Sequence, residues 1–193
     1  MRRKTKRNLI IAGFIVLLVA LGVVAVNDYQ LRAGNKNWSN AYTTLQSLVH
    51  VGNLGSTHEH ADFAMYINGK QIDFTKPEYL HVHPLVHIHG INEGESERGV
   101  IHKHATGVTY GMFFRTLGIT IDNCLTINEK EFCDTNGRTL KYYLNGGITP
   151  NLADEEIHDL DKVLISYGSE SLVELQQQLA SIPNNACVQS KTC

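Results

Sequence analysis

The chain of 193 residues lacks a C-x-x-C pair, and its few cysteines are Cys124, Cys133, Cys187 and Cys193. Zinc ribbons and thioredoxin-like redox sites are built on such pairs, so their absence disfavours both classes. Outside the cytoplasm an even cysteine count favours disulfides. Pairing near neighbours, Cys124 with Cys133 and Cys187 with Cys193, is the simplest connectivity, and free thiols are the alternative.

Positive charge is scarce beyond the first seven residues. The chain has 17 Lys and Arg against 19 Asp and Glu, and five of the basic residues lie within residues 1–7. The remainder therefore carries 12 basic and 19 acidic residues, a net charge of −7. Such an acidic domain disfavours nucleic acid as a partner and suits cations.

One long apolar run is present, directly after the basic cluster. Leu9 to Val26 is 18 residues without a charge, whereas the apolar part of a cleaved signal peptide spans only about 7 to 15 residues. We therefore predict an uncleaved single-pass anchor over residues 1–26, and a cleaved signal peptide is the alternative. The basic cluster places the N-terminus in the cytoplasm and everything after Val26 outside it, at the cell membrane.

The rest of the chain divides into three segments. Residues 27–57 predict a stalk helix and a linker, residues 58–169 a histidine-rich α+β domain, and residues 170–193 a terminal helix with a Cys-containing tail. Within the domain, period-two patterning from His58 predicts a half-buried strand, and Asn68-Gly69 predicts a hairpin turn. Residues 109–118 predict a helix capped by Thr109 or Thr106 and ending at Gly118. The expected fold is a small mixed sheet with one packed helix.

Histidine is abundant, and eight of the ten histidines form four H-x-H pairs: His58 with His60, His81 with His83, His87 with His89, and His102 with His104. Residues two apart in a strand project to the same face about 6.5 to 7 Å apart, so each pair can contribute two imidazoles to one ion. Surface histidines on the wet face of a sheet are the alternative.

The stretch "LHVHPLVHIH", residues 80–89, alternates apolar residues and histidines. A continuous strand would place all four of its imidazoles on one face, but Pro84 requires an edge strand or a break. His83 and His87 are too far apart in an extended strand to share an ion. We therefore expect two sites, each completed by a pair from another strand.

Imidazole ligands favour Cu(II) or Zn(II) over Mg²⁺ and Ca²⁺. Asp62 extends the first pair to H-x-H-x-D and is a candidate ligand or a group that orients an imidazole. Neutral imidazole is the binding form, so affinity should fall below about pH 6.

Two resemblances add to this interpretation. The segment "GMFFRTLGI" through "LKYYLNGG" to "DLDKVLISYG" resembles β-grasp domains, which implies a final strand at the sheet centre. The pieces "HEHADFAMYING", "IHKHATGVTYGMFFRTLGI" and "DLDKVLISYG" resemble an uncharacterised family of membrane-anchored, histidine-rich extracytoplasmic proteins of archaea and small-genome bacteria. Some relatives are labelled protein disulfide isomerases, which the cysteine spacing here does not support.

The expected function is capture, buffering or delivery of copper or zinc by an anchored extracytoplasmic domain, with an unidentified protein partner for delivery. A zinc-dependent hydrolase or lyase with a three-His site is the enzyme alternative, and Asp62, Glu59 or Glu78 would then be the general base. A thiol-disulfide isomerase-like protein and a non-catalytic interaction module are the remaining alternatives.

Overall fold

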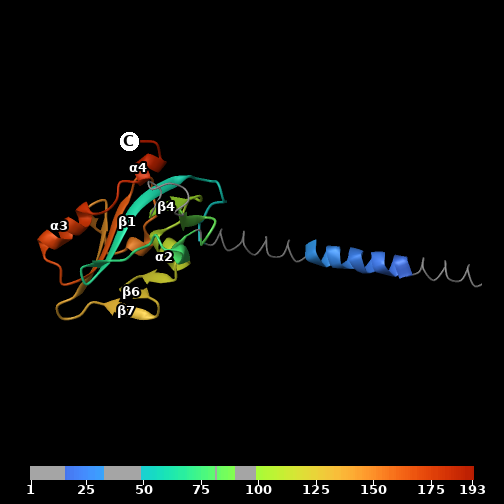
Figure 1. Cartoon of the computed structure of the whole chain (residues 1–193), viewed down its shortest axis with the longest axis horizontal. Coiled ribbons are helices and arrows are strands. Elements are labelled where there is room, and N and C mark those ends of the chain that lie inside the picture. Colours follow the sequence, from blue (N-terminus) through green and yellow to red (C-terminus); the bar gives the residue numbers. More distant parts are fainter. Residues whose placement is uncertain (1–15, 33–48, 81, 90–98) are drawn as a thin grey trace, which may run out of the picture. The chain divides into compact units, whose positions relative to one another are not determined.

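The structure is a computed structural model that describes residues 16–32, 49–80, 82–89 and 99–193 (Figure 1). The chain separates into two compact units, Met1–Leu48 and Val49–Cys193. In the first unit residues 16–32 are helical, and no helix in the described part of the chain is long and apolar enough to cross a membrane. Residues 1–15 of the predicted anchor and 33–48 of the predicted stalk lie outside the described residues.

The second unit is built on a seven-stranded mixed sheet with the order β3-β4-β1-β10-β8-β9, in which β2 also pairs with β1. β1 and β10 are parallel neighbours, and every other pair in this sheet is antiparallel. The predicted α+β class with a mixed sheet is therefore confirmed. The strands are β1 (Glu59–Ile67), β2 (Lys70–Gln71), β3 (Val86–Ile88), β4 (Val100–Lys103), β8 (Thr139–Leu144), β9 (Gly147–Ile148) and β10 (Lys162–Gly168).

A smaller antiparallel sheet consists of β5 (Ile119–Ile121), β6 (Cys124–Ile127) and β7 (Lys130–Cys133). Cys124 lies directly opposite Cys133 across β6 and β7, and the two form a disulfide. Cys187 and Cys193 form the second disulfide, so the predicted near-neighbour pairing is confirmed.

Helices cover both faces of the large sheet. α2 (Tyr110–Thr116) begins at the cap residue Thr109, whose hydroxyl accepts a hydrogen bond from the Met112 backbone, as the sequence predicted. α3 (Leu172–Ala180) begins with a capping box, and α4 (Ala186–Gln189) lies within the predicted polar tail. The described residues of this unit also contain the short 3-10 helices η1 (Pro77–Tyr79) and η4 (Leu152–Asp154).

The main core lies between α2 and the sheet, where Phe63 packs edge-on against Phe113 and Phe114 at ring distances of 5.6 and 5.7 Å. A second apolar cluster, Ala64 with Leu164 and Ile182, covers the opposite face, on the side of α3 (Figure 1). The predicted strand is present as β1, but the prediction that one of its faces is exposed is wrong. The C-terminal segment buries the face that period-two patterning assigned to water.

The continuous strand considered for residues 80–89 is also not formed. β3 contains only Val86–Ile88 and lies at the edge of the sheet, and the chain bends at Pro84. Proline has no backbone N–H for a sheet ladder, which is the physical reason for this break.

Candidate metal centre

Three adjacent strands bring histidines to one face of the sheet. In the register of these strands, His102 in β4 lies directly opposite His60 in β1 and directly opposite His87 in β3. Because side chains alternate along a strand, the H-x-H partners His58, His89 and His104 are directed to the same face. The three H-x-H pairs that the structure describes in full therefore form one cluster of six imidazoles.

His102 lies at the centre of this histidine cluster. Its ring centroid is 3.9 Å from that of His89 and 4.5 Å from that of His104. The His58 and His60 rings lie 4.4 Å away, and the His87 ring 5.5 Å away. Every other imidazole of the cluster thus lies within ring-contact distance of one side chain on the middle strand.

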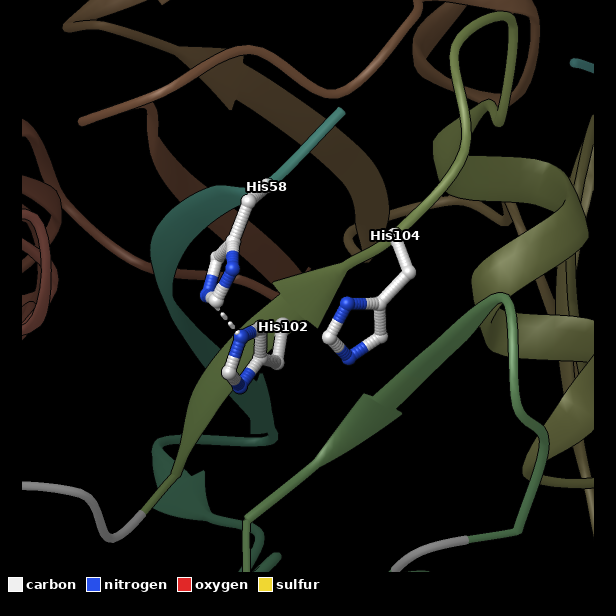
Figure 2. A group of neighbouring side chains, drawn as sticks. All are labelled: His58, His102 and His104. Carbon is white, nitrogen blue, oxygen red and sulfur yellow. Dashed lines mark hydrogen bonds between the residues drawn. The ribbon is translucent and has the colours of Figure 1, made fainter. Parts of the chain in front are cut away.

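Among the residues that the structure describes, two groups of three imidazoles could each hold a metal ion, and both include His102. One group is His58, His102 and His104, whose rings point toward one another (Figure 2). The other is His87, His89 and His102. In each group one ligand nitrogen per residue lies within 4.8 Å of the others. The expectation of two separate sites is therefore corrected, because the two groups share a residue.

The two ring nitrogens of His102 face different partners. Nδ1 of His102 contacts Nε2 of His89, and Nε2 of His102 lies 2.5 Å from Nε2 of His58. Two ring nitrogens that face each other in this way can share one proton or bind one metal ion between them.

Burial keeps the inner imidazoles neutral. His102 is only 7% exposed and His60 only 4%. Burial, together with the neighbouring imidazoles, lowers the pKa of His102 to about 2. Burial also lowers the pKa of His60 and of His104 below the usual value. Neutral imidazole is the form that binds metal, so the fold supplies the required protonation state.

A hydrogen bond selects the binding nitrogen of His87. Nδ1 of His87 lies 3.1 Å from the backbone oxygen of His83, and since a carbonyl only accepts, Nδ1 carries the proton. Nε2 of His87 is then the nitrogen with a lone pair for metal.

His83 itself supports the turn at Pro84. Its Nδ1 accepts a hydrogen bond from the backbone N–H of Leu85 at 3.2 Å, and it belongs to neither three-histidine group. His81 lies outside the described residues. The pair His81 and His83 is therefore not shown to contribute a half-site.

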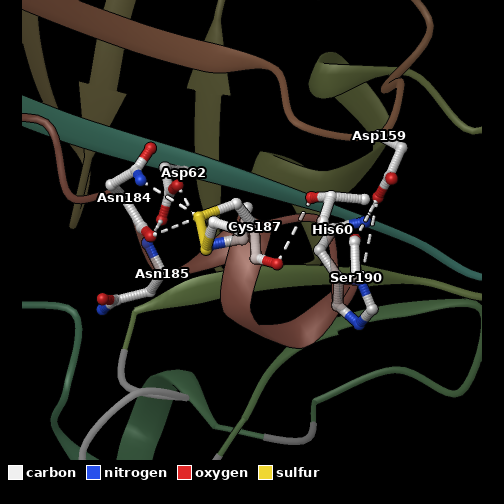
Figure 3. Close-up of a disulfide and its surroundings, with 10 residues drawn as sticks. His60, Asp62, Asp159, Asn184, Asn185, Cys187 and Ser190 are labelled. Carbon is white, nitrogen blue, oxygen red and sulfur yellow. Dashed lines mark hydrogen bonds and ion pairs between the residues drawn. A yellow bond between two sulfur atoms is a disulfide. The ribbon is translucent and has the colours of Figure 1, made fainter.

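A relay from the C-terminal segment orients His60 (Figure 3). Ser190 Oγ donates to Asp159 Oδ1 at 2.5 Å, which uses its only proton. Nδ1 of His60, 2.8 Å from the same Oγ, must then be the donor, leaving its Nε2 as the acceptor nitrogen. The sequence gives no signal for this relay, because Asp159 and Ser190 lie far from His60 along the chain.

Asp62 supports the fold rather than the imidazoles. Its two carboxylate oxygens accept backbone N–H bonds from Asn185 and Ala186, each at 3.1 Å, at the start of α4 (Figure 3). Burial raises the pKa of this carboxyl, and the two N–H bonds oppose the shift. The predicted role of Asp62 as a ligand or an orienting group is not supported by these contacts.

The other predicted carboxylates also lie apart from the two three-histidine groups. Glu59 binds Lys103 Nζ at 2.6 Å, and Glu78 is an exposed residue of η1. Neither belongs to a group that can hold a metal ion among the described residues.

Comparison with protein-family models, curated proteins and solved structures finds no match for this chain. The functional conclusion therefore depends on the geometry of the histidine cluster.

Proposed function

We propose that this protein is a membrane-anchored extracytoplasmic metal-binding protein that captures, buffers or delivers Cu(II) or Zn(II). The observation that supports the proposal is the convergence of six imidazoles from three neighbouring strands around His102. One H-x-H pair on a wet sheet face would be ordinary, but buried neutral imidazoles that face each other nitrogen to nitrogen suit metal ligation.

The chemistry of the ligands supports the choice of metal. Imidazole suits Zn, Cu and Ni, whereas Mg²⁺ and Ca²⁺ prefer oxygen. Both three-histidine groups contain imidazole alone, and all four cysteines are held in disulfides. The acidic balance of residues beyond the N-terminus would favour the approach of a cation.

The exposure of the cluster supports exchange of the ion. His102 is buried, but His58 is exposed at one end of the cluster. A ligand at the surface can transfer an ion to an incoming protein or receive one from it. The sequence of residues 1–26 supports an anchor at the cell membrane, with residues 49–193 outside the cytoplasm.

The test is metal analysis of the full chain, purified in mild detergent without a His tag or chelator. We expect Cu or Zn at one or more equivalents per chain by plasma mass spectrometry. A His58→Ala/His104→Ala variant should lose at least half of that metal, because it removes two ligands of one group.

His50→Asn/His158→Asn is the matched control, because it removes two histidines outside the cluster. Asn tolerates the positive φ of His50. A protein that stays empty and takes up neither Cu nor Zn at neutral pH would overturn the proposal, provided that circular dichroism shows a folded chain.

A zinc-dependent hydrolase is the second candidate, and one observation favours it. Three imidazoles leave an open position at a four-coordinate zinc ion, which is the arrangement of a catalytic site. Against it, two of the candidate general bases have other partners. Glu59 accepts a hydrogen bond from Lys103, and Asp62 accepts backbone hydrogen bonds at the start of α4. We expect the zinc-loaded chain to hydrolyse p-nitrophenyl acetate no faster than the His58→Ala/His104→Ala variant, and a faster rate would favour the hydrolase.

The parallel placement of β1 beside β10, with α2 packed on the sheet, supports the β-grasp resemblance. It also keeps open a non-catalytic interaction module. That alternative requires no metal affinity tighter than micromolar, so an affinity measured by competition with a chelator of known strength separates it from the metal-binding proposal.

A further inference from the structure

His102 is directed at two different partners through opposite edges of one ring. Its Nδ1 faces His89, which belongs with His87 to the group on the β3 side. Its Nε2 faces His58, which belongs with His104 to the group on the β1 side.

One ion cannot use both ring nitrogens of a single imidazole, because their lone pairs point away from each other. With metal–nitrogen bonds of about 2.0 to 2.1 Å, ions bound at the two edges of one ring would be about 6 Å apart. The two groups share His102 through opposite nitrogens. Either only one group binds an ion at a time, or both bind ions that the His102 ring joins.

We propose that the cluster is a dinuclear centre in which the imidazolate of His102 bridges two metal ions. His58 and His104 hold the first ion with Nε2 of His102, and His87 and His89 hold the second with Nδ1. This inference rests on the proposed metal-binding function and specifies its site. A neutral imidazole carries one ring proton, so binding of the second ion releases that proton to water.

The fold supports this arrangement in three ways. His102 lies on β4, between β3 and β1, so each neighbouring strand can supply ligands to one side of the ring. The hydrogen bond between Nδ1 of His87 and the His83 carbonyl leaves Nε2 of His87 as the metal-binding atom. The burial of His102 also shields the bridge from competing water.

Cu(II) is the diagnostic probe, because two Cu(II) ions joined by an imidazolate couple antiferromagnetically and lose their electron paramagnetic resonance signal on cooling. We would titrate the full chain in detergent with Cu(II) at pH 7.5, count bound copper by plasma mass spectrometry, and integrate the signal at low temperature. The expected result is two coppers per chain, with an integrated signal less than half that of two isolated ions.

Variants test whether His102 carries the coupling. In His102→Asn every bound copper should regain its full signal, whatever the stoichiometry, because an amide cannot bridge. His89→Ala and His58→Ala keep His102 but each weakens one side, so each should bind one copper tightly and give the signal of one isolated ion. His158→Asn, outside the cluster, should keep both coppers and the coupling.

The outcomes separate the bridge from the metal-binding function. One copper with a full signal, or two coppers with a full uncoupled signal, would overturn the bridge and leave metal binding intact. A folded chain that binds no copper would overturn the bridge, and one that takes up neither copper nor zinc would overturn both. Coupling that survives in a folded His102→Asn variant would also overturn the assignment of the bridge to His102.

Discussion

At the residue scale, two adjacent side chains of β4 point to opposite faces of the sheet. His102 contributes to the histidine cluster, while the next side chain, that of Lys103, is completely buried. Its Nζ donates to Glu59 at 2.6 Å, to Glu156 at 2.8 Å and to the Ile157 carbonyl at 2.5 Å. These bonds join β1, β4 and the loop before β10 behind the histidine cluster.

Lys103→Met should destabilise the protein without removing a metal ligand. It leaves two carboxylates without their counter-ion, which costs about 3 to 5 kcal/mol for a fully buried pair. The Glu59 and Glu156 side chains are 24% and 36% exposed, so water offsets part of this cost and we expect about 2 kcal/mol. Urea denaturation measures the change. The exposed Lys70→Met should stay within about 0.5 kcal/mol of the wild type, and equal effects would contradict this role of Lys103.

Ser190→Ala tests the relay to His60. Removing the hydroxyl leaves Nδ1 of His60 without its acceptor, so the tautomer and ring orientation are no longer held. His60 belongs to neither three-histidine group, but its ring lies 4.4 Å from that of the ligand His102. We therefore expect metal affinity to fall, but by less than the roughly 10-fold that follows loss of an orienting contact to a ligand itself. A competition titration with a chelator gives the affinity. Ser181→Ala, whose hydroxyl binds Tyr66 far along β1, is the control and should keep the wild-type value.

At the scale of elements, the C-terminal segment shapes the histidine cluster although it supplies none of its imidazoles. α4 is held by Asp62 at its start, and the disulfide Cys187–Cys193 closes the segment that carries Ser190. The other disulfide joins β6 to β7, and those strands contribute no residue to the two three-histidine groups. The two bridges are therefore expected to differ in function.

The matched double variants Cys187→Ala/Cys193→Ala and Cys124→Ala/Cys133→Ala separate these roles. Each removes a short closed loop, worth up to about 2.5 kcal/mol of stability. Only the first should also weaken metal binding, because it loosens Ser190 and with it His60, whose ring packs 4.4 Å from that of the ligand His102. Calorimetry and the chelator titration on both proteins test this, and an equal loss of affinity in the two variants would show that α4 does not orient His60.

At the scale of the whole molecule, the histidine cluster makes the stability of the metal-free protein depend on pH. The pKa of His102 is about 2 and that of His60 and His104 is lowered, all chiefly by burial. Below about pH 6.5 the unfolded chain binds protons that the folded chain excludes. The contribution of these histidines to the free energy of unfolding is therefore fully present above about pH 6.5 and is lost as the pH falls.

We expect the urea midpoint of the metal-free chain to fall steadily from pH 7 to pH 5. Asp62 acts in the opposite direction, because its raised pKa lets the folded state take up a proton first as the pH falls. The variant His102→Asn/His104→Asn should show a shallower decline across the same range, and an identical slope would show that the histidine cluster is not the cause.

Local patterns in the sequence were sufficient to predict several elements of the fold. The alternation from His58 predicted the strand that forms β1, and Thr109 caps a helix where expected. Asn68 and Gly69, both with positive φ angles, form the predicted turn. These features depend on the chemistry of neighbouring residues. The near-neighbour disulfides belong with them, since the two cysteines of each bridge lie only nine and six positions apart in the sequence.

By itself, the sequence determined which residues can bind metal and that each H-x-H pair presents both rings on one side of a strand, because period two is a local property of the backbone. Only the tertiary structure decided that β4 lies between β3 and β1, that His102 joins two groups, and that Asp159 and Ser190 orient His60. Strand order and long-range contacts arise from how the whole chain buries its apolar surface, and no short stretch of sequence contains that information.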